Sequence, residues 1–319
     1  MLRMIAGRLP QIAITLALLS LAAYLAIGAM PGDPISLAMM ADPRLGPADV
    51  ARMRALHGLD QPLLARWWAW AAGVLRGEFG YSRLFARPAA EVLWPALRGS
   101  LVLLGAALAL AASLGVAAGM LAALRPRWRG AVDAVALLSQ ALPAFWLGIL
   151  LIILFAVTLG WLPAGGSPEG GGFAEAARFL ILPVATLAIA HLAAYARHTA
   201  ASMAEVLQSP WITATRARGN PESRIAIRHA LPNAAVPLLS ILALDAGSLV
   251  SGALITETVF ARPGMGKLLT DAVMGNDHNL ALLALMLVAA TTLLATLAAD
   301  LAQRALDPRL TGREWGRMP

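Results

Sequence analysis

The stretch SPWITATRARGNPESRIAIRHALPN, residues 209–233, is polar, and apolar runs long enough to enter a bilayer lie on both sides of it. Ser209 before Pro210 is a helix-start signal, and Gly219 is a helix-stop signal. Asn220-Pro221-Glu222 then repeats the start signal. We therefore expect a short helix, a glycine corner and a second short helix that ends near Leu231-Pro232. A basic helix-turn-helix between two membrane spans must lie at an aqueous surface.

The composition places this chain of 319 residues among polytopic membrane proteins. Hydrophobic residues make up 59% and charged residues 13%, with a mean hydropathy of +0.70, which is too little charge to cover a soluble protein of this length. The net charge of +7 comes mainly from arginines in short connections, which indicates membrane topology and not a nucleic-acid partner. The chain has no cysteine, which excludes disulfides, zinc–thiolate sites and thiol catalysis.

Six apolar runs predict an all-α membrane protein with six transmembrane helices. Arginines gather at the N-terminus, after the second run, after the fourth run and in the tail, so the positive-inside rule places both termini in the cytoplasm. The first run resembles a signal peptide, but its length and the lack of a small-x-small site favour an uncleaved span. The predicted spans are about residues 9–30, 100–124, 132–159, 179–195, 234–256 and 280–302, the third interrupted at Pro143.

A polar region follows the first span and is expected to lie outside, with short helices opened by Pro47 and by Gln61-Pro62 and ending at Gly58 and near Gly77. The second of these helices carries three tryptophans, which either lie at the membrane–water interface or pack the small helices together. They are Trp67, Trp68 and Trp70. The predicted divisions are residues 1–30 (first segment and span), 31–98 (external region), 99–308 (main transmembrane domain) and 309–319 (cytoplasmic tail).

No residue pattern for bond chemistry is visible. The histidines show no metal-ligand spacing, and there is no G-x-S-x-G nucleophile elbow. Residues 264–267 (GMGK) resemble part of a phosphate loop, but Ala261 replaces the first glycine of that loop and Leu268 replaces its Ser or Thr. We therefore expect no catalytic residue, no metal site and no bound cofactor in this chain.

One ionisable residue, Asp245, stands in the middle of a predicted span, where a charge costs at least about 2.5 kcal/mol. Ser248 and Gly252 follow on the same helical face, and Ser251 lies nearby. These residues either line a solute path or fix helix packing through an interhelical hydrogen bond, and the sequence leaves both interpretations open. His191 is expected to be structural, because nothing near it in the sequence offers a proton-relay partner.

Short motifs occur in order along nearly the whole chain. They are residues 31–34 (PGDP), 57–62 (HGLDQP), 77–82 (GEFGYS), 142–146 (LPAFW), 159–163 (LGWLP), 257–260 (ETVF), 263–266 (PGMG) and 306–309 (LDPR). Each is weak alone, but in this order on a matching topology the chain resembles the dipeptide/oligopeptide/nickel permease family, the inner-membrane permease subunits of ABC importers.

Residues 209–233 match the signature of such permeases, E-A-A, three residues, Gly, nine residues, I-x-L-P, with both spacings kept. Thr213 stands in place of the Glu, Thr215 in place of the second Ala and His229 in place of the Ile, which puts in doubt any contact made through that Glu. In the family this segment is a coupling helix seated in a groove of the ATPase. The resemblance therefore implies ATPase coupling through Thr213, Ala214, Thr215, Arg216, Arg218, Gly219, His229, Leu231 and Pro232.

The resemblance also implies a type I ABC importer permease fold in the bacterial inner membrane. The partners would be a second, homologous permease, two cytoplasmic ATPase subunits that bind ATP-Mg, an external solute-binding protein and the lipid bilayer. The solute would be a di- or oligopeptide or a related small solute such as a nickel complex. An external gate or loop motif would comprise Glu257, Phe260, Pro263, Gly264 and Gly266.

Two other classes are weaker matches to the sequence. A stand-alone secondary transporter or channel would favour charged relays in several spans and two halves of similar pattern, and the sequence shows one central charge and no obvious inverted repeat. An intramembrane enzyme would need a catalytic pair, which the sequence does not offer.

Overall fold

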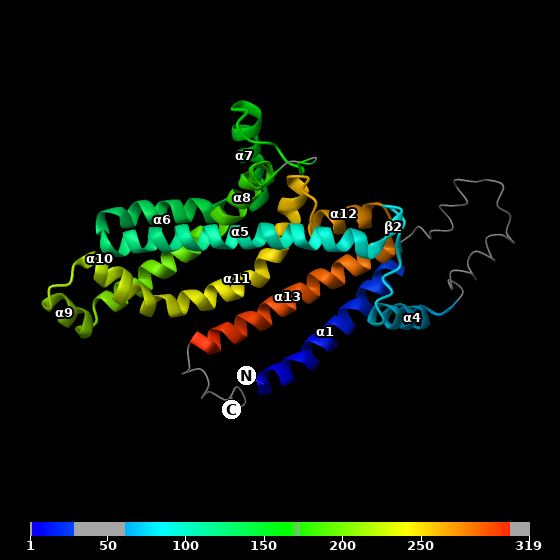
Figure 1. The fold of residues 1–319 in the computed structure, drawn as a ribbon, viewed down its shortest axis with the longest axis horizontal. Helices are drawn as coiled ribbons and strands as arrows, with labels where there is room; N and C mark the ends of the chain where they lie inside the picture. The colour runs from blue at the N-terminus through cyan, green and yellow to red at the C-terminus, as the bar shows by residue number, and fades with distance from the viewer. Residues whose placement is uncertain (1, 29–60, 169, 171, 307–319) are drawn as a thin grey trace. The chain divides into compact units, whose positions relative to one another are not determined.

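The computed structural model describes residues 2–28, 61–168, 170 and 172–306, and most of these residues are helical (Figure 1). The chain divides into two compact units. The larger comprises Leu97–Lys267 and Thr291–Pro319 together with Met1, and the smaller comprises Leu2–Ala96 and Leu268–Ala290. The predicted divisions at residues 30, 98 and 308 stay predictions.

The larger unit is built from apolar helices, among which α8 packs against α6, α7 and α11. It also contains most of α5 (Ala89–Leu124) and the end of α13 (His278–Leu306). Its other elements are α6 (Pro126–Ala141), α7 (Ala144–Leu151), η1 (Ile152–Thr158), α8 (Phe173–Leu207), α9 (Pro210–Ala217), α10 (Glu222–Arg224), η2 (Ile225–Ala230) and α11 (Leu231–Val259).

Within the described residues, four helices are long and apolar enough to cross a membrane, and they correspond to the predicted first, second, fourth and sixth spans. They are Ile5–Gly28 of α1 (Leu2–Gly28), α5, α8 and His278–Ala302 of α13. α5 and α8 extend well beyond the predicted limits, because the flanking segments are rich in good helix formers such as Ala and Leu. α11 contains the predicted fifth span, but several of its side chains lie outside the description, so the count of six stays a prediction.

The predicted third span is broken where Pro143 stands. α6 ends at Ala141, α7 begins at Ala144, and the two helices are bent by 99°. A proline has no N–H for the helix ladder and disfavours the helical conformation of the residue before it, so Leu142 is extended at φ −97° and ψ 126°. The interruption is therefore confirmed, and the bent pair is a fifth span if both halves cross together.

The smaller unit contains α1, α4 (Leu63–Leu75), the strands β1 (Tyr81–Ser82) and β2 (Arg87–Pro88), and parts of α12 (Met265–Met274) and α13. α4 confirms the helix predicted to open at Gln61-Pro62 and end near Gly77. The antiparallel hairpin, with Tyr81 opposite Pro88, was not expected in an all-helical chain. The helix predicted over residues 47–58 and the motif at 31–34 lie outside the described residues.

Two of the three tryptophans on α4 pack inside the smaller unit. The indole N–H of Trp67 donates to Ser20 Oγ (3.1 Å), and that of Trp70 donates to Asn279 Oδ1 (3.2 Å). Trp68 is 68% exposed. Helix packing therefore explains Trp67 and Trp70, and the interfacial interpretation applies to Trp68 alone.

Asp277 joins the hairpin to the start of α13. Its carboxylate accepts hydrogen bonds from the Ser82 hydroxyl (2.7 Å) and from the backbone N–H of Leu84 (3.0 Å) and Leu280 (3.2 Å). A carboxylate at this position satisfies an N–H group of the first helical turn and is favoured by the helix dipole. The residue is 3% exposed, so its charge is compensated by these donors and not by water.

α5 and α8 approach each other closely in the larger unit. A Cβ placed on Gly115 would lie 2.6 Å from the Tyr195 Cβ, and one on Gly119 would lie 2.5 Å from the Ala196 carbonyl oxygen. Small residues allow such contact in lipid, where the hydrophobic effect does not drive helices together. The G-x-x-x-G pair of the sequence is therefore a packing surface.

We expect Gly119→Val to lower the thermal unfolding midpoint of the purified protein in detergent. The added side chain has no space at this backbone contact, and overpacking of this kind costs about 1–3 kcal/mol. Gly105→Val on the same helix is the matched control, because a Cβ there meets no described atom within 4 Å. Equal midpoints for the two variants would contradict the packing.

Candidate functional site

The segment from α9 to the start of α11 has the predicted helix–corner–helix form. α9 begins at Pro210 and ends at Ala217, and α10 begins at Glu222. The predicted end near Leu231-Pro232 is wrong, because α10 continues through η2 directly into α11. The wider π-helical turns of η2 bring the chain past Pro232, whose missing N–H removes a bond from the ladder.

The corner between α9 and α10 is held by polar contacts. Gly219 has φ +77°, a left-handed conformation that glycine adopts at little cost, and its N–H donates to the Arg216 carbonyl (2.9 Å). The Asn220 side chain donates to the Thr215 carbonyl (3.1 Å). A Cβ on Gly219 meets no described atom within 4 Å, so the backbone angle, and not space, requires glycine here.

Arg216 and Glu222 form an ion pair across the corner. Arg216 Nε lies 2.6 Å from Oε1 of Glu222, and its Nη2 lies 3.3 Å from Oε2. The hydrogen bond from Arg216 lowers the pKa of the Glu222 carboxyl, although both side chains are well exposed. The arginine expected to face a partner protein thus has a partner within its own chain, as fits a bidentate carboxylate contact.

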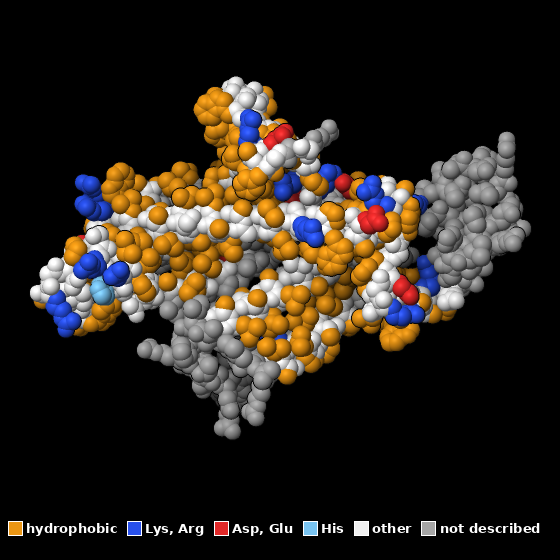
Figure 2. All heavy atoms as spheres, viewed as in Figure 1, with side chains coloured by type: hydrophobic (Ala, Val, Ile, Leu, Met, Phe, Trp, Pro, Cys, Tyr) orange, Lys and Arg blue, Asp and Glu red, His pale blue; other side chains and the backbone are white. Residues whose placement is uncertain are grey.

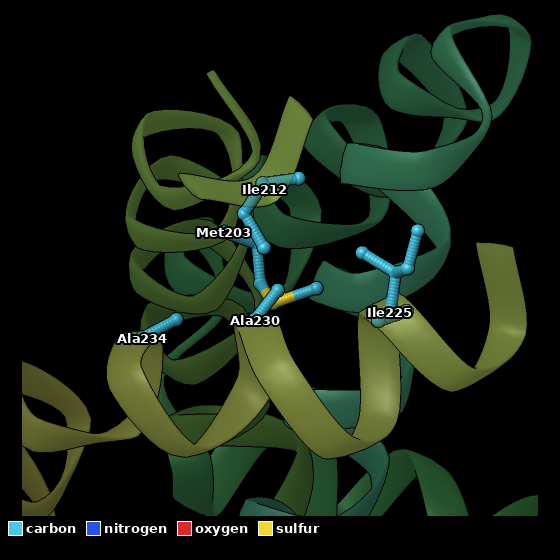
Figure 3. Packing of buried hydrophobic residues seen from close by; sticks show 6 residues of the cluster. Met203, Ile212, Ile225, Ala230 and Ala234 are labelled. Atoms are coloured by element: carbon cyan, nitrogen blue, oxygen red, sulfur yellow. The ribbon is translucent and has the colours of Figure 1, made fainter. Parts of the chain in front are cut away.

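The inner face of the segment is anchored in a hydrophobic cluster (Figure 3). Ile212 of α9 is fully buried against Met203 near the end of α8 and against Ile225 of η2. Side chains from the end of α5 also pack there, as do Ala230 at the end of η2 and Ala234 near the start of α11. α9 is therefore seated on the ends of α5 and α8 and on the start of α11, and cannot shift without moving them.

The outer face of the segment is exposed and carries most of the predicted coupling residues. Figure 2 shows Lys or Arg side chains gathered over α9 and α10. Trp211 is 43% exposed on this face. Thr213, Ala214, Arg216, Arg218, Gly219 and Pro232 are exposed, and Thr215, His229 and Leu231 are half-buried.

Asp245 of α11 faces His191 of α8. Oδ2 of Asp245 lies 3.5 Å from His191 Nδ1, and the two side chains are 24% and 23% exposed. The sequence near His191 offers no partner for a proton relay, but the structure brings Asp245 to it from another helix, and the structural role of His191 stays a prediction. Ser248, Ser251 and Gly252 lie on α11, but their side chains are outside the described part of the chain.

The predicted external motif forms a buried cluster of hydrogen bonds around Glu257, which we call the Glu257 knot. The carboxylate accepts hydrogen bonds from the Ser100 hydroxyl and from the Gly266 N–H (2.7 Å), while Ser100 Oγ accepts one from the Met265 N–H (2.8 Å). Glu257 is fully buried. A Cβ on Gly264 would collide with this carboxylate, which explains the glycine. The motif therefore ties the end of α11 and the start of α12 to α5.

Phe260 extends this knot toward α7. It is 1% exposed, and its ring lies against Gly148 of α7, where an added Cβ would be 3.1 Å away. The Phe260 carbonyl accepts a hydrogen bond from the Gly166 N–H (2.7 Å), and a Cβ on Gly165 would collide with the same backbone. A Cβ on Gly99 would likewise lie 2.5 Å from the Pro263 carbonyl oxygen. All five motif residues thus make close contacts, and all but Pro263 are buried, while the gating role stays a prediction.

Comparison with known proteins identifies the family. The model described as "Binding-protein-dependent transport system inner membrane component" matches residues 115–312, and the model of the N-terminal part of such components matches residues 1–87. The chain belongs to this family. It is the permease subunit of a binding-protein-dependent ABC importer, and with its long apolar helices it is a multi-pass protein of the bacterial inner membrane.

The relatives of this permease match it along nearly the whole chain. It is 34% identical to the "Di/tripeptide transport system permease protein DppB" of Pseudomonas aeruginosa and 33% identical to the "Glutathione transport system permease protein GsiC" of Escherichia coli K12, in each case over 97% of this chain and 99% of the relative. It is 31% identical to the "Oligopeptide transport system permease protein AppB" of Bacillus subtilis, over 92% and 94%.

The fold of the permease is similar to that of a solved importer subunit. A chain of the inward-facing MetNI methionine ABC transporter superposes with a TM-score of 0.56 at 20% identity, covering 69% of this chain and 98% of that one. At this identity the likeness concerns the fold alone. It agrees with the type I importer architecture that the sequence motifs imply.

Sequence reasoning missed several residues of these sites in the permease. Ser100, Tyr195 and Ile212 carry no motif, and each acts through a contact with a distant segment. A weak signal existed for Ile212, because it is the one large aliphatic residue of this short helix. No local pattern distinguishes Ser100 from the other serines of the spans.

We expect Glu257→Ala to destabilise the permease, because it leaves the Ser100 hydroxyl and the Gly266 N–H without their acceptor. A buried polar group left unsatisfied costs about 1–3 kcal/mol. Thr258→Ala is the control, since the neighbouring Thr258 is exposed and bonds only to the Leu254 carbonyl of its own helix (3.0 Å). Thermal unfolding in detergent measures both, and a Glu257→Ala midpoint equal to that of the control would refute the knot.

Proposed function

We propose that this permease forms a solute path with a second, homologous permease and is driven by two ATPase subunits that contact residues 209–232. The main support is the seating of α9. One face of this short helix is buried on α5, α8 and the start of α11, while the other face is exposed. A helix with this double attachment transmits a rigid-body shift of a bound partner to the membrane helices.

The exposed face of α9 has the character of a docking surface. Trp211 lies next to Thr213 and Ala214, and aromatic residues together with arginine are enriched at protein–protein contacts. Arg218 lies at the corner, at the end of the exposed face. In this proposal the ATPase contacts Thr213, which stands in place of the glutamate that the signature prescribes. The Arg216–Glu222 pair stiffens the corner and does not bind the partner.

The names of the relatives support a peptide as the solute. Three full-length relatives are named for di- and tripeptides, glutathione and oligopeptides, all of which contain peptide bonds and a free ammonium group. We propose that an external binding protein delivers such a solute and that the path passes Asp245 of α11. The Glu257 knot then closes the outer end of α11 as part of the gate. ATP-Mg is bound by the ATPase partners, and this chain performs no bond chemistry.

The proposed membrane topology of the permease follows from the distribution of its arginines. Six spans with both termini in the cytoplasm place residues 209–232 on the cytoplasmic side, where an ATPase is available. The Glu257 knot falls on the opposite side.

We expect Gly219→Val to abolish ATP-driven uptake of a dipeptide while the protein still inserts into the membrane. A β-branched residue strongly disfavours φ +77°, so the corner reshapes and α9 no longer presents its outer face correctly. Gly219→Asn is the matched variant, because asparagine tolerates the left-handed conformation and the space beside Gly219 is open. Uptake by reconstituted vesicles and the amount of co-purifying ATPase are the measurements.

Two outcomes would contradict this assignment. Wild-type uptake by Gly219→Val would remove the coupling role of the corner. Robust transport by the purified chain without any ATPase would identify a secondary transporter or channel instead.

A further inference from the structure

The contact between His191 and Asp245 is a loose one. The distance of 3.5 Å between Nδ1 and Oδ2 exceeds the 2.7–3.2 Å of an ordinary N–H···O hydrogen bond. Both side chains keep about a quarter of their surface exposed, whereas the two buried acidic residues described above, Glu257 and Asp277, are 0% and 3% exposed. The pair is therefore accessible, which a purely structural bridge inside a bundle does not need to be.

Tyr195 lies beside the His191–Asp245 pair. Its ring stacks with that of His191, with centroids 6.4 Å apart and an interplanar angle of 26°, and it is fully buried. The Asp245 carboxylate lies beside the same pair of rings through its contact with His191. The tyrosine hydroxyl makes no hydrogen bond of ordinary geometry within the described part of the chain. A buried, unsatisfied hydroxyl next to a charged group is uncommon, and a polar group of a ligand would satisfy it.

Several of the described neighbours of the pair are apolar. Tyr195 belongs to a hydrophobic cluster with Ala188 and Leu238, and Ile241 and Leu242, one turn before Asp245, pack against that cluster. A charge acts strongly on its neighbours in such low-polarity surroundings. On the other side of Tyr195, Gly115 of α5 fixes the position of the ring.

We infer that Asp245 binds a cationic group of the solute in transit, namely the N-terminal ammonium of a peptide, and that His191 holds the carboxylate between passages. A carboxylate has about four acceptor positions, and an ammonium has three donors, so the solute can replace His191 without leaving the charge unpaired. A second donor of the ammonium can meet the Tyr195 hydroxyl, which also accepts. This inference rests on the proposed peptide-importing function and names the residues that recognise the solute within the membrane.

This exchange of the solute for His191 at Asp245 also fits what a transport path requires. A site in a path must bind well enough to admit the solute and weakly enough to release it. A His191 side chain that returns to Asp245 after each passage favours release, because it competes with the solute for the carboxylate.

The test is a double-mutant cycle in the complete importer, reconstituted in vesicles with its ATPases and binding protein. The variants are Asp245→Asn, His191→Gln and the two combined, and the readout is ATP-driven uptake of labelled dialanine. We expect Asp245→Asn to reduce uptake at least tenfold in both backgrounds, and His191→Gln alone to keep it within about threefold. Glu175→Gln, an exposed charge change at the start of the same α8, is the control and should be neutral.

A structural ion pair gives a different result. Both single variants would then lose uptake equally, and the double variant would lose no more than either, because each change breaks the same contact. That outcome, or wild-type uptake by Asp245→Asn, overturns the inference while leaving the importer function intact. Failure of the wild-type complex to take up dialanine would instead overturn the proposed solute class, and this inference with it.

Discussion

The close approach of α5 and α8 at Gly115 and Gly119 is the contact on which the larger unit depends. In lipid the hydrophobic effect does not draw helices together, so contact between backbones supplies the attraction. Toward the ends of these two helices, Met203 and its neighbours form the seat of α9. Toward the middle, the same contact fixes Tyr195 beside His191. The exposed α9 segment, proposed above to meet the ATPase, and the polar pair inside the bundle are therefore attached to one packed helix pair.

The buried carboxylates of this chain show how its charges are compensated by hydrogen-bond donors. Glu257 is surrounded by the Ser100 hydroxyl and backbone N–H groups, and Asp277 by the Ser82 hydroxyl and the first turn of α13. Both are sealed and fully supplied with donors, as a structural charge should be. Asp245 differs, because its contact with His191 is long and accessible. This contrast within one chain is the reason for proposing that Asp245, unlike Glu257 and Asp277, contacts the solute.

Much of residues 209–233 was predictable from local rules. Pro210, Gly219 and Glu222 start and stop the helices where capping chemistry says they should, and Gly219 has the positive φ that the signature glycine implies. The end of the second helix was not predictable, because proline normally interrupts a helix and the π-helical turns of η2 avoid the interruption. The ion pair of Arg216 with Glu222 was also missed, since charge alone does not tell an internal partner from an external one.

By itself, the sequence determined that this is a membrane protein, where most of its long helices run, and where the corner between two of them lies. It also showed which family the chain resembles. These features depend on composition and on short-range rules of helix formation. Only the tertiary structure decided that Asp245 meets His191, that Glu257 meets Ser100, and that Ile212 seats α9 on α5 and α8. Helical periodicity assigns a residue to a face, but which face of another helix lies opposite is set by the packing of the whole bundle.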